Sequence, residues 1–248
     1  MINIKTDSEV AAMREANAIV RDLLCYIEEH VKEGVSTAYL DKLAREFIEK
    51  RGAKPSFLGY NGFPASICAS VDDVVVHGIP NRNVILREGQ IIGVDVGAYI
   101  HGFHGDAART FAVGRISAEK QRLIDVTREC FFKAVEIIKA GVRLGDVGAT
   151  IQAHAESNGY SVVRELVGHG IGREMHEDPA VPNYGTAGYG VRLQRNMTIA
   201  IEPMVNMGRK EVYTARDGWT VRTADGMPSA HYENTILVTD SGVEILTL

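Results

Sequence analysis

The order of the expected secondary-structure elements occurs twice along the 248 residues of the chain. In each part, two segments with helical hydrophobic spacing, each followed by a glycine, come before several apolar runs of strand length. The expected helices cover 8–31 (with Asp7 or Ser8 as N-cap), 40–48, 118–140 (with Ser117 as N-cap) and 144–158. The expected strands cover 66–70, 74–77, 90–99, 103–113, 161–167, 198–205 and 232–239. This doubled order predicts an α+β fold in a single domain, 1–248, with pseudo-repeats at about 1–115 and 116–248 related by a pseudo-twofold axis.

Two acidic residues interrupt the apolar pattern of an expected β-hairpin, IIGVDVGAYIHGFHGDAARTF. A turn centred on Ile100 and His101 would place Asp95 directly opposite Asp106, where like charges destabilise a strand pair. No lysine or arginine lies between these two acids in the sequence. One acid alone would fit a solvated face, but two together in an apolar sheet need a cation. The hairpin therefore predicts a bound metal ion.

The second half repeats this placement of acids. Glu202 lies in the apolar run TIAIEPM, and Glu233 follows in SAHYENTIL. A histidine motif also occurs once in each half, HGIP at His77 and HEDP at His176. If the two halves fold face to face, we expect the four acids to meet at one centre.

The four acids together with one histidine have the composition of a metal site. His169 lies in GHGIG, where the glycines allow close backbone approach, although a histidine there could instead bond only to a backbone carbonyl. Carboxylates with one imidazole suit Mn²⁺, Fe²⁺, Co²⁺ or Zn²⁺, and four carboxylates favour two bridged ions roughly 3.5–4 Å apart. Such a centre generates hydroxide near neutral pH for acyl hydrolysis. His77 and His176 could then bind or polarise the substrate amide.

Composition and missing motifs exclude several other functions. The net charge of −5 gives no basic surface for DNA, and no apolar run reaches the length of a membrane span. Three scattered cysteines without CxxC spacing favour reduced thiols and a cytoplasmic location. HEDPA lacks the second histidine of an HExxH zinc motif, and Pro179 and Pro182 prevent the helix that a dinucleotide-binding loop requires. No P-loop or GxSxG motif occurs.

At this point the residues resemble a known family over nearly the whole chain. The motifs GHGIGREMHEDPAVPNY and SVDDVVVHGIP, together with the five ligand candidates in order, resemble type I (bacterial) methionine aminopeptidases. The resemblance implies the pita-bread (creatinase/aminopeptidase, peptidase M24) fold, in which two pseudo-twofold-related halves surround a central antiparallel sheet. It also implies removal of the initiator methionine from nascent, deformylated polypeptides when the second residue is small.

The resemblance further implies how two divalent ions would be held. Asp95 would bind one metal through both oxygens, and Asp106 and Glu233 would bridge the two metals. His169 and Glu202 would complete the other metal, and Glu202 would also be the general base for the bridging water. The identity of the ions, whether Co, Mn, Fe or Zn, stays open.

The substrate-binding residues follow from the same resemblance. His77 would contact the substrate amide, and His176 would stabilise the oxyanion. The methionine pocket would be lined by Tyr60, Phe63, Cys68 and Trp219. Aromatic and soft neighbours suit a thioether.

Three positions depart from the family pattern and leave the shape of the pocket open. Leu166 stands where members more often carry an aromatic residue or Met, Met175 where Phe is common, and Gly97 where many have Thr or Ser. We expect a monomer that acts on nascent N-termini. Transient ribosome contact would suit that task, although an acidic chain offers no evident RNA-binding surface.

Two alternatives remain at this point. One is an Xaa-Pro aminopeptidase-like enzyme of the same fold, whose members usually carry a further N-terminal domain. The other is a non-catalytic pita-bread binding protein, whose members have lost metal ligands. All five ligand candidates are present in this chain.

Overall fold

The computed structural model describes residues 2–248. Its helices are α1 (Asp7–Glu28), α2 (Thr37–Lys50), α3 (Ala118–Ile137) and α4 (Leu144–Ser157), with a short 3₁₀ turn η1 (Tyr60–Gly62). The strands are β1 (Lys54–Pro55), β2 (Ile67–Val71), β3 (Val74–Val76), β4 (Ile91–Ile100), β5 (Phe103–Ala112), β6 (Ser161–Val162), β7 (Gly168–Gly170), β8 (Glu177–Val181), β9 (Thr198–Ile201), β10 (Met204–Asn206), β11 (Val212–Thr214), β12 (Val221–Thr223), β13 (Ser229–His231), β14 (Asn234–Val238) and β15 (Val243–Ile245).

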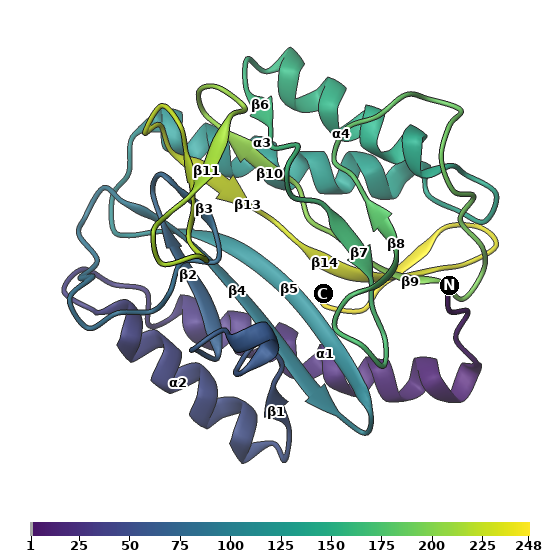
Figure 1. Cartoon of the computed structure of the whole chain (residues 1–248), viewed down its shortest axis with the longest axis horizontal. Coiled ribbons are helices and arrows are strands. Elements are labelled where there is room, and N and C mark those ends of the chain that lie inside the picture. Colours follow the sequence, from purple (N-terminus) through teal and green to yellow (C-terminus); the bar gives the residue numbers. More distant parts are fainter. Residues whose placement is uncertain (1) are drawn as a thin grey trace.

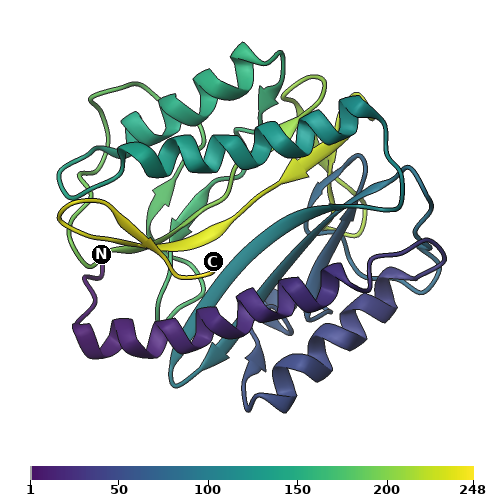
Figure 2. The same cartoon turned by 180° about the vertical axis from the view of Figure 1, so that it is seen from behind.

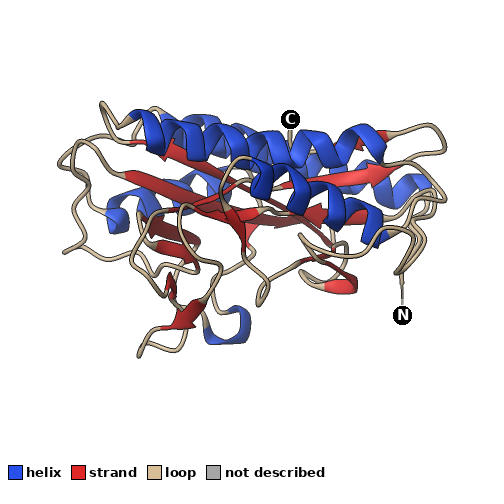
Figure 3. Ribbon diagram, turned by 90° about the horizontal axis from the view of Figure 1, so that it is seen from above, coloured by secondary structure: helices blue, strands red, loops and turns tan. Residues whose placement is uncertain are grey.

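The four α-helices lie on the same side of the strands, while most loops lie on the other side (Figures 2 and 3). Helices α1 and α2 cover the first group of strands, and α3 and α4 cover the second (Figure 1). Each group has its own apolar core, one containing Leu23 and Val94 and the other Phe131 and Ile199. No helix within the described residues is apolar enough, over a sufficient length, to span a bilayer.

The strands form four antiparallel groups. One group has the order β1-β4-β2 with β5 also paired to β4, and the largest has the order β15-β14-β9-β7-β8. The smaller groups are β13-β10-β6 and β11-β12-β3. All pairs in these groups whose direction is assigned are antiparallel, as the sequence predicts for the central sheet.

The helix starts show why these segments are helical. Helix α1 is capped by Thr6 rather than by the expected Asp7 or Ser8. The Thr6 hydroxyl accepts the amide of Glu9, and the Glu9 carboxylate accepts the amide of Thr6, so two free amides at the helix start are satisfied together. The hydroxyl groups of Ser36 and Ser117 cap α2 and α3, each by accepting one backbone amide. Ser117 is the cap that the sequence predicts.

The turn of the β4–β5 hairpin lies one residue further along than the sequence predicts. It consists of His101 and Gly102, with φ values of 54° and 84°, so Ile100 pairs with Phe103. A two-residue hairpin turn of this kind needs a left-handed backbone at both central positions. Glycine adopts this conformation freely and histidine tolerates it, whereas the β-branched Ile100 would be strained there.

The shifted turn changes how the two acids face each other. Asp95 pairs with Ala108 and Asp106 pairs with Gly97, so the acids are diagonal neighbours on one face and not directly opposite. The neighbouring Gly105 faces α1, where an added Cβ would lie 2.8 Å from a helix backbone nitrogen. Because adjacent side chains alternate between faces, Asp106 points away from the helix layer.

Strand β5 also joins the two halves of the chain, because it lies beside the segment that leads into β14 (Figure 1). The backbones of Ala108 and Glu233 exchange two hydrogen bonds with N–O distances of 3.3 and 3.0 Å. The hydroxyl of Thr235 donates to the carbonyl of Asp106 at 2.9 Å, and that of Thr110 donates to the carbonyl of His231 at 2.9 Å. These bonds fix the acids of one half against those of the other.

Several expected strands and three of the expected helices end earlier than predicted, among them α1, which ends at Glu28 and not at residue 31. The run 198–205 is divided into β9 and β10 at Glu202 and Pro203, and proline has no amide for a strand ladder. The run 161–167 keeps only β6, because after Val163 the chain leaves the sheet edge. Helix α3 ends at Ile137 and not at residue 140, since Ile138 has an extended backbone and is buried in the core.

Candidate active site

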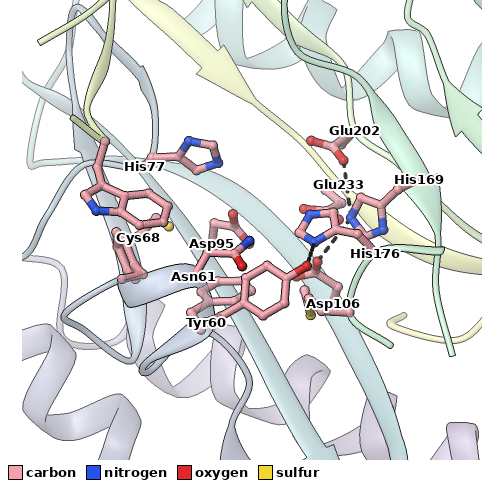
Figure 4. Close-up of a pocket in the computed structure, with 14 residues that line it drawn as sticks. Tyr60, Asn61, Cys68, His77, Asp95, Asp106, His169, His176, Glu202 and Glu233 are labelled. Carbon is pink, nitrogen blue, oxygen red and sulfur yellow. Dashed lines mark hydrogen bonds and ion pairs between the residues drawn. The ribbon is translucent and has the colours of Figure 1, made fainter. Parts of the chain in front are cut away.

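One cavity of about 310 Å³ brings together all the site residues named from the sequence (Figure 4). They come from both halves of the chain and from strand ends and loops. The cavity is lined by Phe57, Tyr60, Asn61, Phe63, Cys68, His77, Asp95, Asp106, His169, Met175, His176, Glu202, Trp219 and Glu233. It therefore has an acidic part, three histidines and an apolar part.

The acids are held by elements that meet at the centre of the molecule. Asp95 and Asp106 lie in β4 and β5, Glu202 directly follows β9, and Glu233 directly precedes β14. His169 occupies the middle of β7. In Figure 4 the side chains of these residues converge on the same space. The two interruptions of the strands, at Glu202 and Glu233, thus coincide with acids that line the cavity.

The carboxyl groups are buried without enough hydrogen bonds. Asp106 and Glu233 are only 3% and 1% exposed. One oxygen each of Asp95, Asp106 and Glu233 is buried without any hydrogen-bond partner. Buried polar atoms are normally paired, so these oxygens indicate that a cation is the missing partner.

Burial also controls the protonation of these acids in the absence of a cation. It raises the pKa of Asp95 to about 7. Burial, followed by repulsion from neighbouring acids, raises the pKa values of Asp106, Glu202 and Glu233 well above the usual range. A bound divalent ion would reverse this effect, because it stabilises the ionised form of each carboxylate.

Two overlapping groups of side chains have the spacing of metal ligands. Asp106, His169 and Glu233 form one group, and Asp95, His231 and Glu233 form the other, with ligand atoms in each group within 4.8 Å of one another. Glu233 belongs to both groups. The donor set fits divalent ions bound mainly through oxygen, with imidazole nitrogen as an additional donor.

His169 has the orientation of a metal ligand. Its Nδ1 lies 2.9 Å from the carbonyl oxygen of Gly170, to which the neutral ring donates its proton. Its Nε2 is then a free acceptor and lies 3.6 Å from an oxygen of Asp106 and 3.6 Å from one of Glu202. Burial, followed by the nearby His176, lowers the pKa of His169 to about 3, so the ring is neutral at physiological pH.

The other two histidines lie on opposite sides of the acids (Figure 4). The Nδ1 of His176 is 2.8 Å from the hydroxyl oxygen of Tyr60, and its ring centroid is 4.1 Å from that of His169. His77 directly follows β3 with a left-handed φ of 57°, and its ring lies edge-on to Trp219. Burial lowers the pKa of both histidines. Both rings are thus neutral hydrogen-bonding groups beside the acids.

The apolar part of the cavity lies next to Asp95. Cys68 on β2 pairs directly with Asp95, and burial raises the pKa of its thiol well above the usual value, so the thiol stays protonated. Phe63 packs edge-on against Trp219 with ring centroids 5.2 Å apart. Met175, which is 1% exposed, belongs to the same cluster. This surface suits an unbranched side chain containing sulfur.

Sequence reasoning did not identify Phe57, Asn61 or His231 as site residues. The Nε2 of His231 is buried without a hydrogen-bond partner and lies 3.8 Å from an oxygen of Glu202 and 3.7 Å from one of Glu233. The period of two along SAHYENTIL could have found His231, because it lies two residues before Glu233. No comparable signal marks Phe57 or Asn61.

The three departures from the family pattern have different surroundings. At Gly97 an added Cβ would lie 2.8 Å from both a ring carbon of Phe57 and the Cβ of Ser56, so a Thr or Ser would clash. Met175 forms part of the cavity wall. Leu166 packs against a separate apolar cluster and does not line the cavity. Only Met175 therefore affects the shape of the pocket directly.

The metal-free protein should lose stability as the pH rises from about 6.5 to about 8.5. A buried acid with a raised pKa contributes stability that is present below its ordinary pKa and is lost as the pH rises through its folded pKa, which is about 7 for Asp95. The histidines with lowered pKa are about half protonated in the unfolded state at pH 6.5, so they oppose this trend in part up to about pH 7.5 and no longer above it. The urea midpoint of chelator-treated protein, measured across this range, tests it.

The variant Asp95→Asn provides the control for this pH dependence. It removes one of the buried acids, so its urea midpoint should fall less steeply over the same range. A wild-type midpoint that stays constant or rises would contradict the assignment of these acids as buried and uncompensated.

Comparison with known proteins identifies the family. The model of metallopeptidase family M24 matches residues 11–240. The chain belongs to metallopeptidase family M24. A methionine aminopeptidase of Clostridium acetobutylicum is 56% identical over 248 residues, covering 100% of this chain and 99% of that protein. Family membership implies a divalent metal cofactor, in agreement with the partnerless carboxylate oxygens of this M24 chain.

Solved structures of family M24 confirm the fold expected from the sequence. The methionine aminopeptidase of Thermotoga maritima matches with a TM-score of 0.98 and 47% identity, covering 100% of this chain and 99% of that one. An Xaa-Pro dipeptidase of Bacillus anthracis matches with a TM-score of 0.80 and 27% identity, but the match covers only 61% of that chain. This M24 chain therefore has the pita-bread fold and corresponds in length to the methionine aminopeptidases.

Proposed function

We propose that this M24 chain is a methionine aminopeptidase that removes the N-terminal methionine of a polypeptide when the second residue is small. The observation that carries the proposal is one cavity in which four buried acids adjoin a pocket of sulfur and aromatic side chains. Relatives named for this activity, at up to 56% identity over the whole chain, support it. We treat the chain as a single catalytic domain with pseudo-repeats at about 1–115 and 116–248.

In this proposal two divalent ions occupy the acidic part of the cavity. Asp95, Asp106 and Glu233 would hold one ion, and Asp106, Glu233, His169 and Glu202 would hold the other. When bound, the ions supply an activated water and polarise the scissile carbonyl. The sharing of Glu233 between two ligand groups supports a pair of ions. Co, Mn, Fe and Zn all fit the donor set.

The protein groups around the centre then have separate tasks. Glu202 takes the proton of the attacking water. Its carboxylate lies next to both His169 and His231, among the other acids, which is a suitable position for this task. The buried Nε2 of His231 lies close to both Glu202 and Glu233 without a hydrogen bond to either, so it is a further nitrogen donor available beside the acids. The substrate methionine side chain packs against Cys68, Phe63, Trp219 and the thioether of Met175.

The two neutral histidines bind the reacting amide. When the Tyr60 hydroxyl donates to Nδ1 of His176, the ring proton of His176 lies on Nε2, from where it can donate to the developing oxyanion. His77, on the other side of the acids, contacts the substrate amide. A neutral imidazole has one N–H group to donate, and the lowered pKa values favour neutral rings near pH 7.

The variants His77→Ala and His176→Ala should keep their metal ions and lose activity. Neither side chain is assigned as a ligand, and loss of one oxyanion donor typically costs about 10²–10³ in rate. Metal content by elemental analysis and kcat on Met-Ala-Ser measure the two effects separately. If either variant lost its ions, the division between ligands and substrate-binding histidines would be wrong.

The substrate itself tests the proposed function most directly. Met-Ala-Ser should be cleaved, Met-Leu-Ser should be cleaved poorly because its second residue is large, and Ala-Pro-Ser should resist. Preferential cleavage of Ala-Pro-Ser would indicate an Xaa-Pro peptidase, and no cleavage with any ion would indicate a binding protein. We further propose a cytoplasmic monomer acting on deformylated nascent chains, with transient ribosome contact and no binding to DNA.

A further inference from the structure

The segment before α1 is fixed to the second half of the chain through Lys5. The amide of Lys5 donates to the carbonyl oxygen of Asn196 at 2.9 Å, and the side-chain amide of Asn196 donates back to the carbonyl oxygen of Lys5 at 2.9 Å. Lys5 is only 4% exposed, although lysine is rarely buried unless it is paired. Its backbone therefore has a fixed position from which the side chain extends inward.

The ammonium group of Lys5 meets the carboxylate at the end of the 172–177 loop, where Glu177 is also the first residue of β8. Its Nζ lies 2.6 Å from an oxygen of Glu177, and both side chains are 4% exposed. The other oxygen of Glu177 accepts the backbone amides of Arg173 at 2.9 Å and Glu174 at 3.3 Å. An added Cβ on Gly172 would lie 2.4 Å from Cε of Lys5, so the lysine stem packs directly on this loop. The carboxylate thus ties the whole loop to Lys5.

This loop carries two residues of the active site. Met175 lines the cavity, and His176 lies between Tyr60 and His169. His176 immediately precedes Glu177 in the sequence, so a movement of the Glu177 side chain and backbone displaces the imidazole as well. Lys5 itself does not line the cavity.

We infer that Lys5 is a positioning residue, whose ion pair with Glu177 holds the 172–177 loop so that His176 faces the scissile carbonyl. The inference rests on the proposed function, in which His176 donates to the oxyanion. Burial alone would raise the pKa of Glu177, but hydrogen bonding and charge, chiefly from Lys5, bring it below its usual value, so the carboxylate is ionised and paired. A buried pair that loses one partner leaves an uncompensated charge, which makes the loop sensitive to Lys5.

The variant Lys5→Met tests the inference because it keeps the length of the side chain and removes the charge. We expect kcat on Met-Ala-Ser to fall by roughly 10–100-fold, the scale expected when a reacting group is misplaced by about 1 Å, with KM and metal content little changed. Arg14→Met is the matched control. It removes another ion pair between the N-terminal region and a distant acid, Glu244, at 2.7 Å, but both side chains there are about half exposed. It should keep the wild-type kcat.

A second comparison distinguishes positioning from general destabilisation. If Lys5 acts through His176, Lys5→Met should cause no further loss of kcat in the His176→Ala background, whereas independent losses that multiply would overturn the inference. Should Lys5→Met fail to fold, the double variant Lys5→Met/Glu177→Gln removes both buried charges. A folded double variant with wild-type kcat would also overturn the inference, and a reduced kcat would support it.

Hydrogen–deuterium exchange of the metal-free protein gives a readout that does not need catalysis. The backbone amides of Arg173 and Glu174 should exchange faster in Lys5→Met than in the wild type or in Arg14→Met. Unchanged exchange would contradict the inference, even if the wild-type enzyme proved inactive on Met-Ala-Ser. Inactivity of the wild type with faster exchange in Lys5→Met would instead reject the proposed function while retaining the role of Lys5 in the loop.

Discussion

Removal of divalent ions should abolish cleavage of Met-Ala-Ser, and addition of Mn²⁺, Fe²⁺ or Co²⁺ should restore it. Four acids line one cavity, and three of them have a buried oxygen without any hydrogen-bond partner. In the absence of ions, burial raises the pKa values of all four, to about 7 for Asp95, and repulsion from neighbouring acids raises those of the other three further. The metal-free protein lacks the activated water, and the raised pKa of Glu202 favours the protonated form, which cannot accept a proton.

The experiment requires chelation followed by dialysis, with elemental analysis of each sample. Circular dichroism of the chelated protein shows whether the fold remains, so that loss of activity is not mistaken for unfolding. Stepwise addition of one ion, with activity recorded against the ions bound per chain, tests whether one or two ions are needed. Full activity at zero bound metal would reject the proposed mechanism.

Glu202→Gln should remain folded and lose nearly all turnover. An amide cannot take up the proton of the attacking water, and loss of a general base typically costs about 10²–10⁴-fold. The side chain also lies close to two imidazole rings, with one oxygen 3.6 Å from Nε2 of His169 and the other 3.8 Å from Nε2 of His231. The amide has nearly the same size and shape as the carboxylate and carries no charge, so the local packing should survive.

The measurements for this variant are kcat, metal content and the midpoint of thermal unfolding. Glu165→Gln, at an exposed position, is the control and should behave as the wild type. A Glu202→Gln enzyme with a rate near that of the wild type would remove Glu202 from the mechanism. Loss of both rate and ions would show that Glu202 acts mainly as a ligand.

The sequence predicts the components of this site better than their geometry. Acids in apolar runs mark Asp95, Asp106, Glu202 and Glu233, because such residues are unfavourable in a sheet without a function. All four do line one cavity. The pairing of the first two was nevertheless wrong, since the register depends on which residues adopt a left-handed backbone at the turn, and hydrophobic alternation fits both turns.

Other features could not be read from local patterns. The ion pair of Lys5 and Glu177 joins positions 172 residues apart, and neither side chain has a pattern that indicates its partner. His231 stands two residues before Glu233 as His104 stands two residues before Asp106, but His104 bonds to Ser56 whereas His231 lies close to Glu202 and Glu233, so the spacing does not tell the two histidines apart. The early ends of β9 and of the run at 161–167 arise because the chain changes strand groups, which is a property of tertiary packing.

The hydrogen bonds between β5 and the segment around Glu233 make the active site depend on the contact between the two halves of the chain. Each half builds its own apolar core, yet neither half holds a complete set of site residues. We therefore expect substitutions at Thr110 or Thr235, which remove hydrogen bonds between the halves, to lower activity, although neither side chain lines the cavity. Catalytic activity should therefore depend on the correct docking of the two halves. We expect a chain whose halves are misaligned to lose activity before it unfolds.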